Sequence, residues 1–288
     1  MNVYETVWII GAKGRLGRSL TKILDPSDYR LLSTDKEEVD ITNLQETLSF
    51  AERHMPMAII NCAALSSANA CEENPKEAFK VNAIGARNVA IAANACGAKL
   101  VHLSTDDVFS GERKVPLNEF HPTDATTVYG ITKSYGERFV KEMCSQFFIV
   151  RSSWIYDERT LRKIRLGLKA GNLRFAPKQI ASPTSAPMLA SFIADLLETY
   201  EFGTYHYTAS GLATREEFIG EAARLLGLEK EFSEAKIDVI TETIHPDVVQ
   251  LESLMLSAID YARPSSWRVE LERFIKNFMK KERSRHDS

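Results

Sequence analysis

The sequence lacks the features that mark several large classes of protein. Its 288 residues include only four cysteines, Cys62, Cys71, Cys96 and Cys144, and no two of them form a CxxC pair or a zinc-binding spacing. A small secreted domain held by disulfide bonds would carry cysteines at a much higher density. We therefore expect no metal site and no disulfide framework, and we expect a reduced, cytoplasmic environment.

Long apolar runs and an excess of positive charge are missing as well. No apolar run approaches the roughly 20 residues of a membrane-spanning helix. The first such run ends at Ile10 without a basic segment before it, so we expect no signal peptide. Lys and Arg number 36 against 39 for Asp and Glu, a net charge of −3. Because nucleic acids and anionic membranes bind basic faces, neither is an expected partner.

What the chain does contain is an alternation of short apolar runs with helical patterns through its first half. Repeated strand–helix units predict a parallel sheet with helices on both faces, so the expected fold class is α/β, a Rossmann-type doubly wound sheet. Asn43 is the expected N-cap of one helix and Gly97 the expected stop of another. The expected strands are residues 7–10, 29–34, 58–61, 100–104 and 147–150, and the helices 15–24, 44–53, 75–97 and 128–143.

The second half is less regular and predicts a smaller unit assembled from separate pieces. We expect a first domain at residues 1–156, a smaller part at 157–280 with some segments returning to the first domain, and a polar, frayed tail at 281–288. Within this half, the patterns predict helices at 160–170, 188–200, 214–226 and 266–280, a strand at 203–208 and a loop at 177–187.

A GxxGxxG motif directly follows the first expected strand and opens the first expected helix. In this context Gly11 permits a tight turn, Gly14 lets the backbone approach a pyrophosphate, and Gly17 lets the helix pack on the sheet. Free N–H groups and the helix dipole favour an anion there. The alternative is a tight turn without a ligand. The candidate phosphate-binding residues are Gly11, Gly14, Arg15, Leu16 and Gly17.

Asp35 ends the second expected strand about 20 residues further on. An acid at this place can hold the ribose hydroxyls of a dinucleotide, and it favours NAD over NADP because it repels a 2′-phosphate. Lys13, Arg15 and Lys36 are close enough in sequence to act on the same corner, so the cofactor preference stays open. The alternative for Asp35 is a solvated acid in a turn.

Tyr129 and Lys133 lie four residues apart on an expected helix and therefore share one face. An ammonium beside a phenol lowers the pKa of the phenol, and such a tyrosine can exchange a proton with a carbonyl oxygen. A YxxxK motif alone also fits an exposed pair. Its companion is the segment Ser104-Thr105-Asp106-Asp107, at the carboxyl end of the fourth strand, where open α/β sheets bind their ligands.

With these motifs in view, residues 6–156 resemble an extended short-chain dehydrogenase/reductase, and more narrowly the dTDP-4-dehydrorhamnose reductase family. The resemblance extends more weakly into the second half. The segments that carry it are residues 11–17, 39–42, 60–64, 71–75, 81–86, 104–111, 128–133 and 151–156.

The resemblance implies reduction of the 4-keto group of a dTDP-linked 6-deoxyhexose by NADH or NADPH. It implies Thr105, Tyr129 and Lys133 as the catalytic trio, with Tyr129 as the acid. The substrate would be held by Thr105, Asp106, Asp107 and Trp154. Beside the glycine motif and Asp35, the cofactor would be held by Asp40, Ile41, Cys62, Ala63, Ala64, Ser104, Tyr129 and Lys133.

Departures from the family pattern concentrate in the substrate half. The family often has Tyr where this chain has Asp107, and an Arg-Pro stretch where this chain has Ile244-His245-Pro246. The segments at 157–162 and 178–184 also differ. A different nucleotide sugar is therefore open, as is the oligomeric state, including a homodimer.

Two other functions remain as alternatives. One is a non-catalytic, NAD(P)-binding regulatory subunit, because the resemblance extends to the beta subunit of methionine adenosyltransferase. The other is a sugar-nucleotide epimerase or dehydratase, for which Thr105-Asp106-Asp107 would offer acids beside the catalytic hydroxyl.

Overall fold

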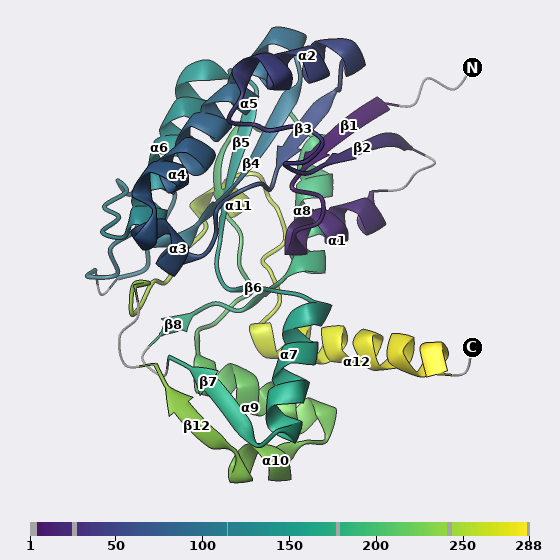
Figure 1. The fold of residues 1–288 in the computed structure, drawn as a ribbon, viewed down its shortest axis with the longest axis vertical. Helices are drawn as coiled ribbons and strands as arrows, with labels where there is room; N and C mark the ends of the chain where they lie inside the picture. The colour runs from purple at the N-terminus through teal and green to yellow at the C-terminus, as the bar shows by residue number, and fades with distance from the viewer. Residues whose placement is uncertain (1–4, 25–27, 114, 177–178, 241–243, 287–288) are drawn as a thin grey trace.

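The computed structural model describes residues 5–24, 28–113, 115–176, 179–240 and 244–286. What we expect from the sequence for residues 1–4, 177–178 and 287–288 lies outside these ranges. A six-stranded sheet forms the upper part of the molecule in Figure 1, and all its neighbouring strands are parallel. The predicted doubly wound α/β class is confirmed. In the order β10-β5-β4-β3-β1-β2, the strands are β10 (Gly203–His206), β5 (Phe147–Ser152), β4 (Lys99–Thr105), β3 (Ala58–Asn61), β1 (Glu5–Ile10) and β2 (Tyr29–Thr34).

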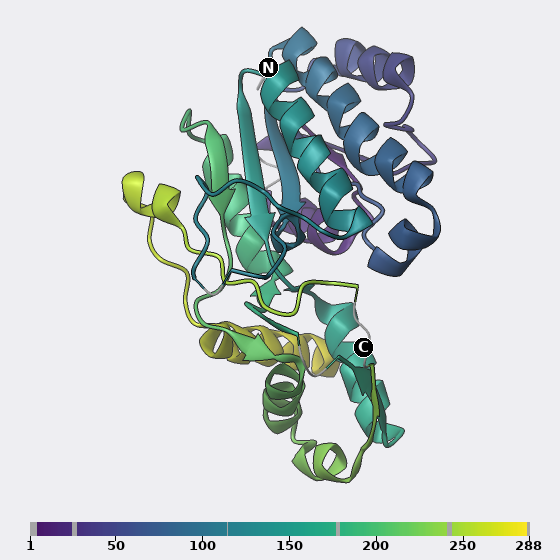
Figure 2. The same cartoon turned by 90° about the vertical axis from the view of Figure 1, so that its left-hand side faces the viewer.

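Helices cover both faces of this sheet because alternate strand residues are apolar on each side. Val7, Ile9 and Ile60 pack with α1 (Arg15–Ile23) and α8 (Ala186–Leu197). Trp8 and Ile59 pack in a second core on the other face, which Figure 2 shows covered by a row of helices. Burial on both faces accounts for the near-continuous apolar runs of these strands. The helices of this row are α2 (Leu44–His54), α5 (Ala86–Cys96) and α6 (Val128–Met143).

Local capping agrees with the sequence at several helix ends. The Asn43 side chain accepts from the Glu46 N–H and caps α2, and Thr127 caps α6 in the same way. Gly97 adopts φ +70° and ends α5. The single helix expected at residues 75–97 is wrong in detail. A π-helical turn, Lys80–Gly85, separates α4 (Pro75–Phe79) from α5, and the unexpected α3 (Ala68–Glu73) precedes them.

A second, smaller unit lies below the sheet and has its own apolar core. Tyr156, Phe218, Trp267 and Phe274 belong to this core. Its helices are α7 (Glu158–Lys169), α9 (Arg215–Leu226), α10 (Glu229–Glu234) and α12 (Trp267–His286). Its short strands are β6 (Ile155–Tyr156) with β9 (Thr184–Ser185), β7 (Asn172–Phe175) with β12 (Lys236–Val239), and β8 (Ile180–Ala181) with β11 (Ala213–Thr214).

The chain returns to the first unit after entering the second. α8, β10 and α11 (Leu254–Ala258) pack on the six-stranded sheet or extend it, although they follow residue 157. The strand expected in the smaller part at residues 203–208 is thus the sixth strand of the main sheet. The division at residues 156 and 157 stays a proposal, with these three elements on the far side of it.

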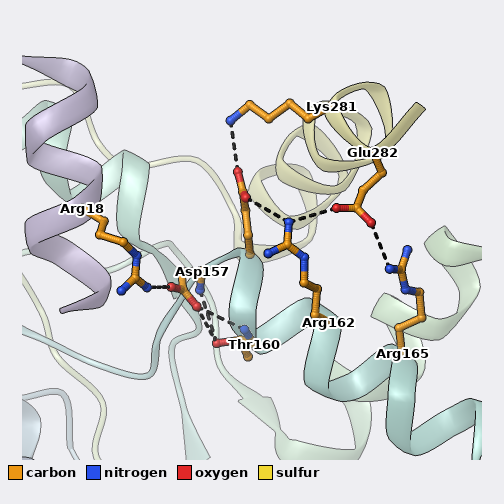
Figure 3. A network of polar contacts seen from close by, with 8 residues as sticks. Arg18, Asp157, Thr160, Arg162, Arg165, Lys281 and Glu282 are labelled. Carbon is orange, nitrogen blue, oxygen red and sulfur yellow. Dashed lines mark hydrogen bonds and ion pairs between the residues drawn. The ribbon is translucent and has the colours of Figure 1, made fainter. Parts of the chain in front are cut away.

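The expected frayed tail is wrong for the residues that the structure describes, because α12 continues to His286. Ion pairs hold this extension against α7, as Figure 3 shows. Glu282 lies 2.9 Å from both Arg162 and Arg165, and Lys281 lies 3.1 Å from Glu158. On α1, Arg18 pairs with Asp157 at 2.5 Å and joins the sheet unit to the start of α7. No helix in the described ranges is long and apolar enough to cross a membrane.

A buried ion pair fixes α6 against the sheet. Arg151 at the end of β5 meets Glu137 of α6 at 2.6 Å, with side chains only 2% and 3% exposed. Ser104 of β4 donates to the same carboxylate at 2.6 Å. Removing one partner of such a pair leaves an uncompensated buried charge.

We therefore expect Glu137→Leu to lower the free energy of unfolding by about 3–5 kcal/mol. Urea denaturation followed by circular dichroism measures this loss. Glu142→Gln is the matched control, because Glu142 pairs with Arg138 on the exposed face of the same helix, and it should leave stability nearly unchanged. Equal losses in the two variants would contradict the role given to the buried pair.

Candidate active site

The glycine motif forms a tight turn at the carboxyl end of β1. Gly11 has φ +77°, and a Cβ there would lie 2.8 Å from the backbone nitrogen of Ala63. A Cβ on Gly17 would collide with the carbonyl oxygen of Gly11, so only glycine lets α1 start this close to the strand. No side chain caps the N-terminus of α1 at Gly14. The first turn of α1, which follows the glycine turn, therefore presents its N–H groups and the positive end of the helix to an anion.

Two adjoining cavities open at this edge of the sheet. The first, of about 330 Å³, lies between the glycine turn and the ends of β2 and β3; the second, of about 480 Å³, lies between the ends of β4 and β5 and the smaller unit. Gly14, Cys62 and Ala64 line both, so the two cavities are neighbours. An elongated ligand such as a dinucleotide fits this arrangement.

Almost every predicted site residue lines one of the two cavities. Gly17 lines neither cavity, and its role is to let α1 pack closely on the glycine turn. Cys62 lines both cavities, and burial raises its pKa to about 12, which keeps its thiol protonated. The smaller cavity is lined by Gly11, Gly14, Asp35, Asp40, Ile41, Cys62, Ala63 and Ala64, and the larger by Gly14, Arg15, Leu16, Cys62, Ala64, Ser104, Thr105, Asp106, Asp107, Tyr129, Lys133 and Trp154.

At the outer end of the smaller cavity, Asp35 accepts a hydrogen bond of 2.9 Å from the backbone N–H of Lys13. This hydrogen bond joins the glycine turn to the residue that follows β2. The Lys13 ammonium, which could otherwise meet a phosphate at this corner, lies 3.3 Å from Glu37 and 3.4 Å from Glu38. Lys36, the other lysine at this corner, lies 3.8 Å from Glu77. Both lysines thus face acids, which favours a ribose with free hydroxyls over a phosphorylated one.

Thr105, Tyr129 and Lys133 come together in the larger cavity. Thr105 ends β4, and the two others lie on successive turns of α6. The Lys133 side chain is only 2% exposed, and its Nζ lies 2.6 Å from the carbonyl oxygen of Leu103 and 3.3 Å from Nε2 of His102. Burial lowers the pKa of Lys133 to about 8, although the Glu137 carboxylate acts in the opposite direction.

The expected lowering of the Tyr129 pKa by Lys133 is wrong for the protein without ligand. Burial raises this pKa, and the nearby carboxylates of Asp107 and Asp106 raise it further, while a hydrogen bond with Thr105 opposes the rise. Tyr129 therefore keeps its proton at neutral pH. A protonated phenol is the form that can donate to a developing alkoxide.

Two departures from the family pattern meet beside this trio. Nδ1 of His245 lies 2.5 Å from Oδ2 of Asp107, and both residues line the larger cavity. The hydrogen bond with Asp107 raises the pKa of His245 despite burial. Sequence reasoning gave His245 no role, although it and Asp107 both stood at positions that depart from the family. Their shared departure from the family pattern could have indicated that the two side chains interact.

Arg215 is the other site residue that the sequence did not single out. It starts α9 in the smaller unit, and its guanidinium lies 3.5 Å from the centre of the Trp154 ring. Burial lowers its pKa to about 10, and the acids Asp106 and Asp107 oppose this change. Arg215 thus remains a cation at neutral pH and faces the larger cavity, where it suits a phosphate group.

Among the acids that line the larger cavity, Asp106 has the most strongly shifted pKa. Its Oδ2 accepts from Ser153 at 2.5 Å and its Oδ1 from Thr105 at 3.2 Å. Burial and the neighbouring Asp107 raise its pKa to about 7. The folded protein therefore holds a proton that the unfolded chain releases near pH 4, so folding becomes less favourable as pH rises from about 4 to 7.

We expect Asp106→Asn to remove part of this pH dependence. Relative to wild type, the variant should gain on the order of 4 kcal/mol of unfolding free energy between pH 4 and pH 8. Urea unfolding at both pH values measures the difference, with Glu52→Gln on the exposed face of α2 as the control. Parallel pH profiles for wild type and Asp106→Asn would contradict the raised pKa.

Comparison with known proteins finds relatives of similar sequence and similar fold. Residues 5–280 match the family model described as the RmlD substrate binding domain. The chain is 31% identical over 277 residues to the spore coat polysaccharide biosynthesis protein SpsK of Bacillus subtilis (strain 168), covering 93% of this chain and 96% of that protein. It is 36% identical over 233 residues to a dTDP-4-dehydrorhamnose reductase of Streptomyces griseus, covering 77% of each chain.

A solved structure gives the same result. The dTDP-4-dehydrorhamnose reductase of Bacillus anthracis str. Ames, solved in complex with NADP, superposes with a TM-score of 0.89. Its sequence is 33% identical, and the match covers 96% of this chain and 100% of that one.

Proposed function

The chain belongs to the RmlD substrate-binding family, and we propose that it reduces the 4-keto group of a dTDP-linked 6-deoxyhexose with NADH or NADPH. One observation carries this proposal: a protonated Tyr129, with Thr105 beside it and Lys133 one turn away, lines a cavity that adjoins the glycine turn. Relatives named dTDP-4-dehydrorhamnose reductase support the reaction and the sugar-nucleotide class.

The residues present fit a nicotinamide dinucleotide. The uncapped start of α1 suits the pyrophosphate, Asp35 suits the adenosine ribose, and Asp40 and Ile41 line the space for the adenine. Lys133 would hold the nicotinamide ribose. The cofactor, when bound, supplies the hydride.

The chain's own contribution is to place the substrate and to supply a proton. Thr105 and Tyr129 would hold the carbonyl oxygen with two hydroxyl groups. Tyr129 would give its proton to that oxygen as negative charge develops there, a step for which its raised pKa keeps it in the required form.

The rest of the substrate would lie toward the smaller unit. Trp154 and Arg215 offer an aromatic face and a cation, which suit a sugar ring and a diphosphate. The Asp107–His245 pair stands where the family has other residues, so we propose that it adapts the cavity to the particular sugar.

We further propose that the protein acts in the cytoplasm and that its reaction needs no partner protein. The four cysteines are free thiols, which suits a reducing compartment. A single chain supplies all the residues that line the larger cavity, from the sheet unit and from the smaller unit. A homodimer is compatible with this proposal and is not required by it.

Tyr129→Phe tests the proton donor. We expect turnover of a dTDP-linked 4-keto-6-deoxyhexose to fall at least about 100-fold, because the general acid is lost, while NADH binding measured by fluorescence is retained. Tyr135→Phe is the control, because Tyr135 lies on the same helix with its side chain exposed. Undiminished turnover in Tyr129→Phe would refute the assignment, and absence of turnover in wild type without a partner would favour a regulatory subunit.

Asp35→Asn tests the cofactor corner. Wild type should bind NADH more tightly than NADPH, because the Asp35 carboxylate repels a 2′-phosphate. The substitution should narrow this preference about tenfold through the lost repulsion. Titration of both cofactors by fluorescence measures the ratio, with Glu52→Gln as the control. An unchanged ratio would show that Asp35 does not set the preference.

A further inference from the structure

One side chain of α1 contacts both the glycine turn and the N-cap of α7. Nη1 of Arg18 donates to the carbonyl oxygen of Lys13 in the glycine turn. Its Nη2 lies 2.5 Å from Oδ2 of Asp157 (Figure 3). The Arg18 side chain is 27% exposed and that of Asp157 only 9%. Neither residue lines the two ligand cavities, so Arg18 can act on them only through the residues that it holds.

On the cofactor side, this contact holds the backbone of the glycine turn. The N–H of Lys13 donates to Asp35 at 2.9 Å, and the carbonyl of Lys13 accepts from Arg18. The next N–H, that of Gly14, donates to the carbonyl oxygen of Gly11 at 3.0 Å. Both backbone groups of Lys13 are thus bonded, at the turn that leads into the proposed pyrophosphate site.

On the other side, the contact holds the start of α7. Oδ1 of Asp157 accepts from the N–H of Thr160 at 3.1 Å and caps the helix, while Oδ2 accepts from Arg18. Thr160 lines the larger cavity, and so do Trp154 and Tyr156, which shortly precede Asp157. This wall of the larger cavity is therefore tied at Asp157 to the helix that follows the glycine turn.

An arginine suits this place for a chemical reason. Its planar guanidinium donates to two acceptors at once in fixed directions, whereas a lysine ammonium acts as a point charge. The Asp157 carboxylate is well shielded from water, so its hydrogen bond to a charged donor is of the strong kind. One rigid group thus holds two segments that border two different ligand cavities.

We propose that Arg18 is a positioning residue that couples the binding of the dinucleotide to the binding of the sugar nucleotide. This inference rests on the proposed function, because it needs both ligands to bind where that function places them. When the glycine turn is ordered by a bound dinucleotide, Arg18 is ordered with it, and through Asp157 so is the start of α7. The second ligand then meets a wall that is already ordered and binds more tightly. The coupling is reciprocal, so each ligand strengthens the other by the same factor.

Fluorescence titration of NADH with and without saturating dTDP measures this coupling. dTDP carries the nucleoside diphosphate but no keto group, so no turnover interferes. In the wild type, dTDP should tighten NADH binding about tenfold. In Arg18→Met, which keeps an apolar stem and removes both donors, the ratio of the two dissociation constants should fall to less than about twofold. An uncoupled wild type, or an unchanged ratio in Arg18→Met, would overturn the proposal.

A second variant removes the same contact from the other end. Asp157→Asn loses the ion pair but keeps a side-chain oxygen for the N–H of Thr160, because asparagine caps helices about as well as aspartate. It should lose the coupling as Arg18→Met does, and the double variant should lose no more than either single variant. Lys22→Met is the control, because Lys22 is exposed on the same helix. Equal loss of coupling in Lys22→Met would overturn the proposal.

A purely structural role for Arg18 predicts a different result. Arg18→Met would then lower the midpoint of thermal unfolding and leave the ratio at its wild-type value, because the ratio compares two titrations of the same folded variant.

Failure of the proposed function is recognised separately. Coupled binding without turnover of a keto sugar would contradict the proposed reductase activity alone. Binding of both ligands without coupling would contradict the role given to Arg18 alone.

Discussion

The buried pair of Arg151 and Glu137 is the constraint on which the site depends. It joins the end of β5 to the middle of α6 at 2.6 Å, and Ser104 at the end of β4 bonds to the same carboxylate. Two strands and one helix are thereby locked in one relative position. Because Tyr129 and Lys133 lie on that helix and Thr105 on one of those strands, the trio is fixed by an ion pair whose two residues line neither ligand cavity.

The edge of the sheet gives the site its chemistry. The carboxyl ends of β1, β3, β4 and β5 lie along one edge of the sheet, and the residues there line the larger cavity. Arg215 and His245 close the cavity from the other side. Burial at this junction moves the protonation states in opposite directions. Tyr129 holds its proton more firmly, and Lys133 holds its proton less firmly. The tyrosine is thus a proton donor before any ligand arrives.

Features that depend on local spacing could be predicted from the sequence. The glycine turn, the strand-end acid Asp35 and the helix that pairs Tyr129 with Lys133 each follow from a few neighbouring residues. Contacts between distant segments could not be predicted in this way. They include the pairing of β10 with β5, the meeting of Asp107 with His245 and the stacking of Arg215 on Trp154. The lowered Tyr129 pKa that the spacing predicts is wrong for a related reason. Spacing shows that two residues share a helix face, but it does not show how deeply they are buried.

Transfer of deuterium tests the central claim most directly. The protein is incubated with NADH deuterated at both C4 positions of the nicotinamide and with a dTDP-linked 4-keto-6-deoxyhexose, and the product is examined by proton resonance. The account predicts an alcohol with deuterium at C4 of the sugar and stoichiometric oxidation of the cofactor. A product altered at C3 or C5 with no net cofactor oxidation, or no product at all, would contradict it.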